Sequence, residues 1–265
     1  MPTTEPAPPR GGTSAQPYAP ETDLIPAAES PQEQPAELAG GIESSLAPHA
    51  PSAAGSVFGS RLPLAVRFAE HLADTGISHG LIGPREVPRL WDRHIVNCAV
   101  IAEVIPQDAA VIDVGSGAGL PGIAVAVARP DLSVTLVEPM ERRTAWLTMV
   151  IADLGLTNVA VRRARAEELH GDLQAEVVTA RAVAALDKLA RWCLPLVLPG
   201  GRLVAMKGSS AEREINEAAQ TLKRLGGGDT GIRTCGAEIL ATPTTVVVVE
   251  VPQSAGGSRS RRRGR

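Results

Sequence analysis

The sequence predicts an α/β fold in which a Rossmann-like, doubly wound sheet is mostly parallel and closes with an antiparallel hairpin at its C-terminal edge. Three observations support this prediction. From Ala110 onward, short apolar runs alternate with helix-like segments, as in parallel sheets covered by helices on both faces. A glycine-rich turn joins the first apolar run to the helix after it. The last two apolar runs have no helix between them, which predicts an antiparallel pair.

Each element of this sheet can be placed from its own run. The expected strands are 110–114, 133–138, 158–163, 176–180, 201–208, a segment near 231–239, and 244–251. The expected helices are 123–128, 143–155, 186–194 and 211–225. Gly155 follows the second of these helices, where glycine commonly ends a helix.

Residues 56–105 are expected to form a helical N-terminal part of the same domain. Apolar residues recur there at helix-like intervals. They are Leu64, Phe68, Leu72, Leu90, Ile95 and Ile101. The domain is therefore expected to span residues 56–251.

The two ends of the chain differ from this domain in composition. Residues 1–55 are Pro/Ala-rich and acidic, with 11 of the 22 prolines and seven acidic residues against one arginine. Such a segment buries too little apolar surface to offset its ordering entropy, so we expect it to be disordered. Residues 252–265 contain five arginines and no acid, and we expect a second disordered tail. That tail could contact RNA phosphates or simply be solvated.

Composition excludes several classes of protein. A net charge of −3 argues against a polyanion binder held by bulk charge, and 2% aromatic residues leave little for a base-stacking platform. The cysteines Cys98, Cys193 and Cys235 lie far apart without metal-ligand spacing, so we expect reduced thiols and no metal. We expect neither a secretory signal nor a membrane span, because no apolar run is long enough.

The turn VIDVGSGAGLPG, Val111–Gly122, is the strongest candidate for a cofactor site. Glycines at this place in a strand–turn–helix unit allow a tight turn and a close approach of the ligand. The next strand ends at Glu138, whose carboxylate is suited to ribose hydroxyls. Because NAD and S-adenosylmethionine both carry ribose, the turn and the carboxylate leave both cofactors open.

Three features favour S-adenosylmethionine over a dinucleotide. Gly115 directly follows the strand and begins a Gly115–Gly117–Gly119 series. Asp113 lies just before the turn, where it could fix the loop or meet the positive end of the donor. The sheet ends in a hairpin, and no second substrate domain follows. We therefore interpret the domain as an S-adenosylmethionine-dependent methyltransferase of Rossmann-like fold.

Several charged residues fall at the carboxyl edge of the predicted sheet, where open α/β sheets bind ligands. Arg181 follows an apolar strand, and a ligand contact is favoured over a surface ion pair. Arg142 and Arg143 begin a helix, where cations oppose the helix dipole, so they could bind phosphate or be merely solvated. Lys207 could contact RNA or form a structural pair, and His94 could face RNA or be structural.

The three tryptophans, Trp91, Trp146 and Trp192, are expected in the core rather than in a base-stacking platform.

Several segments, in this order, resemble the RsmG family, also called GidB, whose members methylate N7 of a guanosine in 16S ribosomal RNA. The segments are RLWDRHIVN (89–97), DVGSGAGLPG (113–122), ERRTAWL (141–147), RARAEEL (163–169), TARAVAAL (179–186) and MKG (206–208). The resemblance covers about residues 60–250. Two departures are Asn97, where many members have Asp, and Arg142, where many have Lys.

The resemblance implies S-adenosylmethionine as the cofactor and assigns its contacts residue by residue. Gly115 and Leu120 would border the donor, and Glu138 would hold its ribose. Ala166 and Glu167 would flank the adenine. Arg181 would lie at the donor and near the target base.

The chemistry of guanine N7 agrees with the motifs. N7 presents a lone pair and loses no proton, so no general base is needed, and the fourth strand is followed by TARA rather than an NPPY-like loop. Positioning of the base would then dominate catalysis, with Arg181 orienting guanine through O6. The expected partner is 16S rRNA in the small ribosomal subunit. We expect a cytoplasmic monomer that binds neither metal nor membrane.

Three alternatives remain at this point. The domain could methylate a protein or a small molecule, it could be a non-catalytic RNA-binding module on the same fold, or it could be an NAD(P) oxidoreductase.

Overall fold

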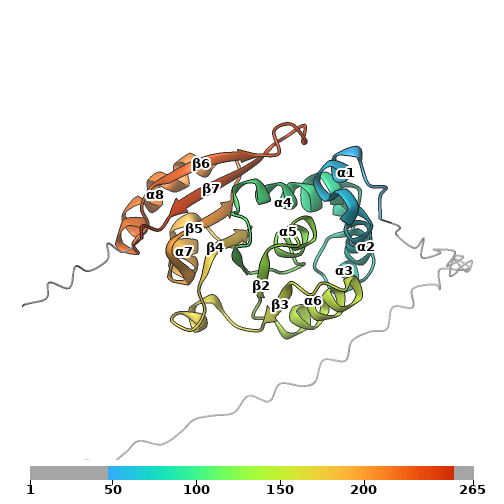
Figure 1. Ribbon diagram of the computed structural model, residues 1–265, viewed down its shortest axis with the longest axis horizontal. Coiled ribbons are helices and arrows are strands. Elements are labelled where there is room, and N and C mark those ends of the chain that lie inside the picture. Colours follow the sequence, from blue (N-terminus) through green and yellow to red (C-terminus); the bar gives the residue numbers. More distant parts are fainter. Residues whose placement is uncertain (1–46, 254–265) are drawn as a thin grey trace, which may run out of the picture. The chain divides into compact units, whose positions relative to one another are not determined.

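The computed structural model describes residues 47–253. Its centre is a seven-stranded sheet with the order β3-β2-β1-β4-β5-β7-β6 (Figure 1). The strands are β1 (Ala110–Val114), β2 (Ser133–Val137), β3 (Val159–Arg162), β4 (Ala175–Arg181), β5 (Val197–Met206), β6 (Thr230–Cys235) and β7 (Thr244–Glu250). The first five strands pair in parallel, and β7 is antiparallel to both β5 and β6. The predicted fold class is confirmed, including the antiparallel C-terminal edge.

Eight α-helices are assigned within the described residues. They are α1 (Ser52–Phe58), α2 (Leu62–Ala73), α3 (Thr75–Ser78), α4 (Val96–Ala99), α5 (Gly122–Ala128), α6 (Glu141–Leu154), α7 (Leu186–Cys193) and α8 (Ala211–Arg224). The last four match the four helices predicted from Ala110 onward to within two residues at each end. Gly155 follows α6 in the left-handed conformation, as expected for a glycine that ends a helix.

The helices divide the core into two layers, one on each face of the sheet. One cluster joins α5, α6 and the N-terminal helices to the sheet, and the other joins α7 and α8 to its opposite face. Neighbouring residues of β1 show the division, since Val111 belongs to the first cluster and Ile112 to the second. Successive side chains of a strand point to opposite faces, so an uninterrupted apolar run is what a doubly covered strand requires.

The N-terminal part is helical, as predicted, but its helices are short and interrupted. A 3-10 segment (Pro84–Arg89) containing Pro88 is followed by a π-helical turn (Leu90–Ile95), α4 and another 3-10 segment (Val100–Val104). Proline removes a helical hydrogen bond, so the turn around Pro88 cannot continue as a regular α-helix.

The expected domain boundary at residue 55 is wrong. Helix α1 begins at Ser52 and buries Ala54 completely, and the indole Nε1 of Trp91 donates to the carbonyl of Pro48 at 2.7 Å. The apolar surface of the helical part therefore holds residues that composition assigned to the tail. The remainder of the two predicted disordered tails, residues 1–46 and 254–265, lies outside the described residues.

The ends of three neighbouring strands meet at one edge of the sheet. Val114 of β1 is level with Val137 of β2 and with Ala180 of β4. The residues that follow these three positions therefore come together there, as the predicted ligand-binding edge requires. Over the range 47–253, no helix is long and apolar enough to cross a membrane.

Candidate active site

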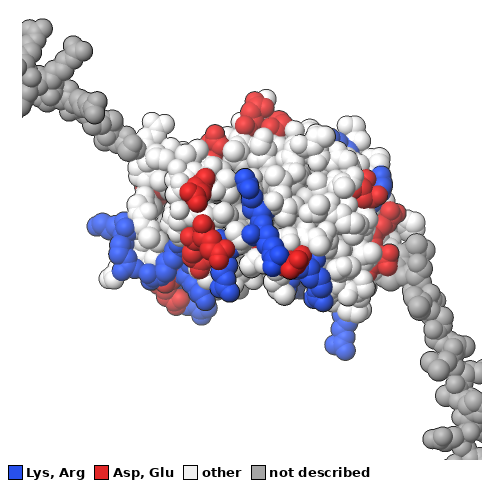
Figure 2. All heavy atoms as spheres, turned by 90° about the horizontal axis from the view of Figure 1, so that it is seen from below, with Lys and Arg blue, Asp and Glu red and all other residues white. Residues whose placement is uncertain are grey.

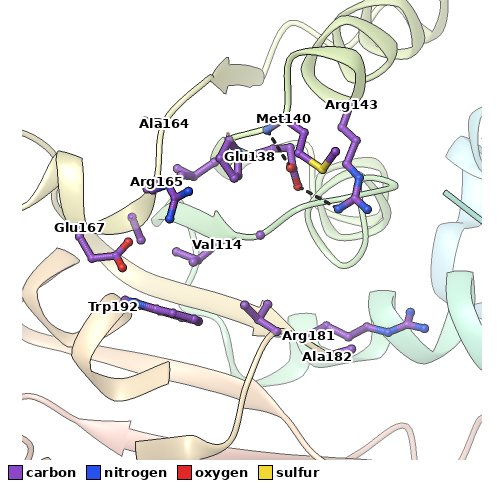
Figure 3. A pocket seen from close by; sticks show the side chains of 15 residues that line it. Val114, Glu138, Met140, Arg143, Ala164, Arg165, Glu167, Arg181, Ala182 and Trp192 are labelled. Carbon is purple, nitrogen blue, oxygen red and sulfur yellow. Dashed lines mark hydrogen bonds and ion pairs between the residues drawn. The ribbon is translucent and has the colours of Figure 1, made fainter. Parts of the chain in front are cut away.

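A cavity of about 420 Å³ opens at this edge of the sheet (Figure 3). The ends of β1, β2 and β4 supply its floor, and the start of α6, the loop after β3 and α7 supply its walls. The residues that line it are Val114, Gly115, Val137–Met140, Arg143, Ala164–Glu167, Arg181–Val183 and Trp192.

Asp113 holds the glycine turn beneath the cavity. Its carboxylate is fully buried and accepts hydrogen bonds from the backbone N–H of Gly122 (3.0 Å) and the hydroxyl of Thr179 (3.2 Å). Burial raises the pKa of Asp113 to about 6, against which these hydrogen bonds act. Asp113 thus ties β1 to the start of α5 and to β4, which fixes the loop, and it does not line the cavity.

Glycine is required at the first position of the turn. Gly115 has φ +71°, a left-handed conformation that costs other residues about 1–2 kcal/mol. A Cβ atom there would also lie only 2.9 Å from Cγ2 of Val183, which follows β4. Gly115 therefore lets the turn and the loop after β4 approach closely at the rim of the cavity.

Glu138 is the central carboxylate of the site. Only 2% of the residue is exposed, and Oε1 and Oε2 accept hydrogen bonds from the backbone N–H groups of Met140 and Gly117, each at 3.0 Å. Nη1 of Arg143 lies 3.7 Å from Oε2 (Figure 3). Two carboxylate oxygens offer about four acceptor positions, so the two backbone bonds leave room for hydroxyl donors of a ligand.

Arg143 contributes an unsatisfied donor at the same wall. Its Nε is buried and has no hydrogen-bond partner among the described residues. Buried polar groups without partners are rare in folded proteins, and one that lines a cavity is suited to an acceptor on a bound molecule.

The opposite wall combines an aromatic ring with a carboxylate. Ala166 and Glu167 line it together with Trp192, over whose ring the Lys188 ammonium lies 4.9 Å from the centroid. Trp192 is at the edge of the core rather than inside it, since it packs against the second cluster but is only half-buried and also lines the cavity. Trp91 and Trp146 are core residues, 3% and 1% exposed.

Arg181 lies at the far end of the cavity and is held by two neighbours from the N-terminal part. Nη1 donates to Sγ of Cys98 at 2.8 Å, and Nη2 lies 2.6 Å from Nδ1 of His94. His94 Nε2 in turn lies 2.8 Å from Oε2 of Glu86. Burial raises the pKa of Cys98 to about 11, so its thiol is neutral and accepts from Arg181 without forming an ion pair.

The protonation state of His94 follows from its partners. A guanidinium can only donate, so Nδ1 of His94 must be unprotonated, and its proton lies on Nε2, which donates to Glu86. Desolvation lowers the pKa of His94, which agrees with a neutral ring. The His94 side chain is 8% exposed, so little of its surface is accessible to RNA. Its contacts with Arg181 and Glu86 favour the structural alternative over an RNA contact.

The other expected site residues fall into two groups. Gly117 supports Glu138 from behind, and Leu120 is 7% exposed without lining the cavity. Arg142 is exposed at the start of α6. Lys207 donates to the carbonyl of Ala184 (2.7 Å) and pairs with Glu214 (2.7 Å), so the structure supports its structural alternative.

Sequence patterns missed several lining residues. Pro139, Met140 and Val183 are neither charged nor part of the glycine turn, and Arg165 is one of many arginines. Pro139 and Met140 could have been found from their position after a predicted strand, whereas Arg165 and Val183 lie in the segments 163–169 and 179–186 that resemble the RsmG family. No group of three or more His, Cys, Asp or Glu residues in a metal-binding arrangement is present in the described part of the chain.

The three cysteines are buried free thiols.

Comparison with known proteins identifies close relatives. The family model described as rRNA small subunit methyltransferase G (GidB) matches residues 61–241. A ribosomal RNA small subunit methyltransferase G of Renibacterium salmoninarum is 58% identical over 201 residues, 76% of this chain and 94% of the relative. One of Salinispora tropica is 54% identical over 219 residues, 80% of this chain and 90% of the relative.

Among solved structures, a precorrin-6y C5,15-methyltransferase of Geobacter metallireducens is 14% identical with a TM-score of 0.43. The match covers 64% of this chain and 89% of that one.

Proposed function

The chain belongs to the rRNA small subunit methyltransferase G family, and on that premise we propose that it methylates N7 of a guanosine in 16S rRNA of the small ribosomal subunit. It is an S-adenosylmethionine-dependent methyltransferase, so the methyltransferase interpretation of the domain is confirmed and the oxidoreductase alternative is set aside. The observation that carries the proposal is the cavity at Glu138 and Arg181, at the carboxyl edge of this family's sheet.

The residues of the cavity fit this donor. Glu138 has acceptor positions left for ribose hydroxyls, and Arg143 has an unpartnered buried donor beside it. The Trp192 ring offers a flat apolar surface for adenine, and Glu167 offers an acceptor for its exocyclic amine. The glycine turn at Gly115 would border the amino-acid part. When bound, S-adenosylmethionine supplies an electrophilic methyl group on a sulfonium.

The residues at the target side have a positioning role in this proposal. N7 of guanine carries a lone pair and no proton, so the protein need not supply a general base. Its contribution is to hold the nucleophile in line with the methyl group and to exclude other geometries. Arg181 would do so by donating to O6 of guanine, an acceptor that arginine recognises well.

The arrangement of Arg181 supports that role. A guanidinium has five N–H donors, and the bonds to Cys98 and His94 use two of them. The three remaining N–H donors have no hydrogen-bond partner among the described residues. The two bonds also fix the plane of the group before any substrate arrives, which lowers the entropic cost of orienting the base.

RNA would be recognised by a local basic surface and by its shape, because the whole chain has a net charge of −3. Figure 2 shows Lys and Arg side chains in a broken band across one face, with acidic side chains between them. Arg142, Arg163 and Arg165 are exposed near the start of α6 and the end of β3, and Arg165 also lines the cavity. They are suited to phosphates beside the target base.

We further propose that the protein acts in the cytoplasm as a monomer, where assembled or nearly assembled small subunits are its substrate.

The proposal can be tested with purified protein and methyl-labelled S-adenosylmethionine. The substrates are small ribosomal subunits from a strain lacking the enzyme, the same subunits from a strain that has it, and free 16S rRNA. We expect label in the 16S rRNA of subunits from the strain lacking the enzyme and none in subunits from the strain that has it. Free 16S rRNA should be labelled less than the subunits from the strain lacking the enzyme. Label in ribosomal protein, or equal label in both sets of subunits, would contradict the proposal.

A further inference from the structure

A second hollow, of about 640 Å³, lies beside the donor cavity. Arg181 and Ala182, at the end of β4, line both spaces and form the boundary between them. The walls come from the N-terminal part (Arg93 and Asn97), from the residues after β5, and from the segment 242–245 that leads into β7. The size lies within the roughly 300–1,000 Å³ typical of small-ligand sites.

The walls of this hollow are tied together across the fold. The hydroxyl of Thr244 donates to the backbone carbonyl of Asn97 at 2.9 Å, which joins the start of β7 to α4. Lys207 N donates to the carbonyl of Thr245 at 3.0 Å, which joins the end of β5 to the same strand. The hollow is therefore bounded by elements held in place by direct hydrogen bonds.

The chemistry of the lining favours an electron-rich polar ligand. Its charged members are Arg93, Arg181 and Lys207, and no acidic residue lies among the described lining residues. Lys207 is paired with Glu214 and Arg93 lies 3.4 Å from Glu86, so Arg181 is the lining cation without a carboxylate partner among the described residues. Asn97, Ser209 and Thr245 add neutral hydrogen-bonding groups. Within residues 47–253, no hydrogen bond engages the side-chain amide of Asn97, although the residue is half-buried.

The backbone at the boundary is strained. Ala182 has φ +54°, in the left-handed region that a residue with a Cβ atom occupies at a cost of about 1–2 kcal/mol. Strain of this kind persists where the surrounding structure enforces it, and it concentrates at functional sites. Here the left-handed conformation of Ala182 turns the chain at the end of β4, so that it passes between the two cavities. Arg181 lines both of them.

We propose that this second hollow receives the target guanosine nucleotide, turned out of its RNA stack, with its N7 facing the donor cavity across Arg181. The inference rests on the proposed function. Guanine O6 would accept from a free donor of Arg181, which leaves the N7 lone pair open to the methyl group, and the N1 and N2 donors match the amide oxygen of Asn97. Arg93, 53% exposed at the rim and 3.4 Å from Glu86, would have its outer N–H groups left for a neighbouring phosphate.

The test compares variants of the hollow with a matched control on the adjacent strand. Asn97→Leu replaces the amide by a group of equal size, and Thr245→Val removes one hydroxyl while keeping the branched shape. Thr234→Val is the control, because Thr234 on β6 is the direct strand partner of Thr245 on β7 and does not line the hollow. Each protein is assayed for donor Kd and for kcat/KM with undermethylated small subunits.

We expect kcat/KM to fall about tenfold or more for Asn97→Leu and about threefold for Thr245→Val, the usual effect of losing one contact to a recognised base. Thr234→Val should stay within about twofold of wild type, and the donor Kd of all three within about twofold, which also shows that they are folded. If Asn97→Leu fails to bind donor, Thr245→Val decides the question.

Two different results would overturn the inference. If both variants keep donor affinity and wild-type kcat/KM, the hollow does not hold the target base, although the proposed function stands. If the wild-type protein binds donor but labels no 16S rRNA, the proposed function fails, and the assignment of the hollow fails with it.

Discussion

Glu138 is a buried carboxylate whose two oxygens already accept backbone hydrogen bonds, from Met140 and from Gly117 of the glycine turn. Glu138 supports the turn through these bonds, and in the proposed function it also binds the ribose of the donor. Replacing it by glutamine should weaken donor binding by at least about tenfold, because the new amide NH₂ would face a backbone N–H donor and one acceptor oxygen would be lost.

Isothermal titration of S-adenosylmethionine against Glu138→Gln measures this effect directly. The matched control is Glu141→Gln, which changes a carboxylate in the first turn of α6 that is 75% exposed and pairs with Arg163. The control should keep its donor Kd within about twofold. Equal affinities for the wild type and Glu138→Gln would remove Glu138 from the cofactor site.

His94 and Arg181 give a second prediction for single residues. The pKa of His94 is lowered by desolvation, so the ring is neutral at pH 7 and becomes protonated only at a pH below its usual range. Protonated Nδ1 cannot accept from Arg181, and the two cations then repel. Methyl transfer should therefore decline as the pH falls below the range in which histidine usually titrates.

Single-turnover rates between pH 5 and 8, for the wild type and His94→Gln, test this coupling. Glutamine can accept from Arg181 through its oxygen and donate to Glu86 without titrating, so its acidic decline should be much smaller. Donor affinity measured over the same range separates this effect from cofactor binding. An acidic decline that persists unchanged in His94→Gln would show that another group causes it.

At the scale of elements, the turn between β1 and α5 depends on a carboxylate that is costly to bury. Because burial raises the pKa of Asp113 to about 6, the native state binds more protons than the unfolded state between about pH 4 and pH 6. The contribution of Asp113 to the free energy of unfolding therefore falls as the pH rises through that window.

Asp113→Asn removes this titration while keeping the hydrogen-bonding shape. Its oxygen can accept from Gly122, and its NH₂ can donate to the hydroxyl of Thr179. The unfolding free energy of the wild type relative to Asp113→Asn should fall by about 2 kcal/mol between pH 4.5 and pH 7. Urea titrations at several pH values measure it, and parallel stability curves for the two proteins would disprove the assignment.

The same elements show what sequence can and cannot predict. The strands of the parallel sheet were predictable because a doubly covered strand is apolar on both faces, as Val111 and Ile112 illustrate. Glu138 and Arg181 were predictable because each directly follows such a strand. The cofactor and RNA roles assigned to them remain predictions.

Other features depend on tertiary contacts that periodicity does not encode. Trp192 has a helical position compatible with the core, and only the packing of α7 beside the loop after β3 turns it toward the cavity. Similarly, the pairing of Arg181 with His94 joins residues 87 positions apart, and the anchoring of Trp91 to Pro48 lies in a segment whose composition indicated disorder.

At the scale of the whole molecule, one edge of the sheet brings together two adjoining spaces with different chemistry. The first has a buried carboxylate and an aromatic wall suited to a nucleoside donor, and the second has cationic and neutral polar walls. Arg181 lies between them and is held by the N-terminal helical part. The helical part therefore shapes the site, and its role extends beyond covering the sheet.

The central claim is that this site transfers a methyl group to N7 of a single guanosine in 16S rRNA. The most direct measurement treats small subunits from a strain lacking the enzyme with the purified protein and unlabelled S-adenosylmethionine. The extracted 16S rRNA is then reduced and cleaved with aniline, which breaks the chain at 7-methylguanosine. We predict one new cleavage site that requires both protein and donor and that is weaker with Glu138→Gln at a donor concentration near the wild-type Kd. Methyl incorporation without a new cleavage at any guanosine would contradict the account.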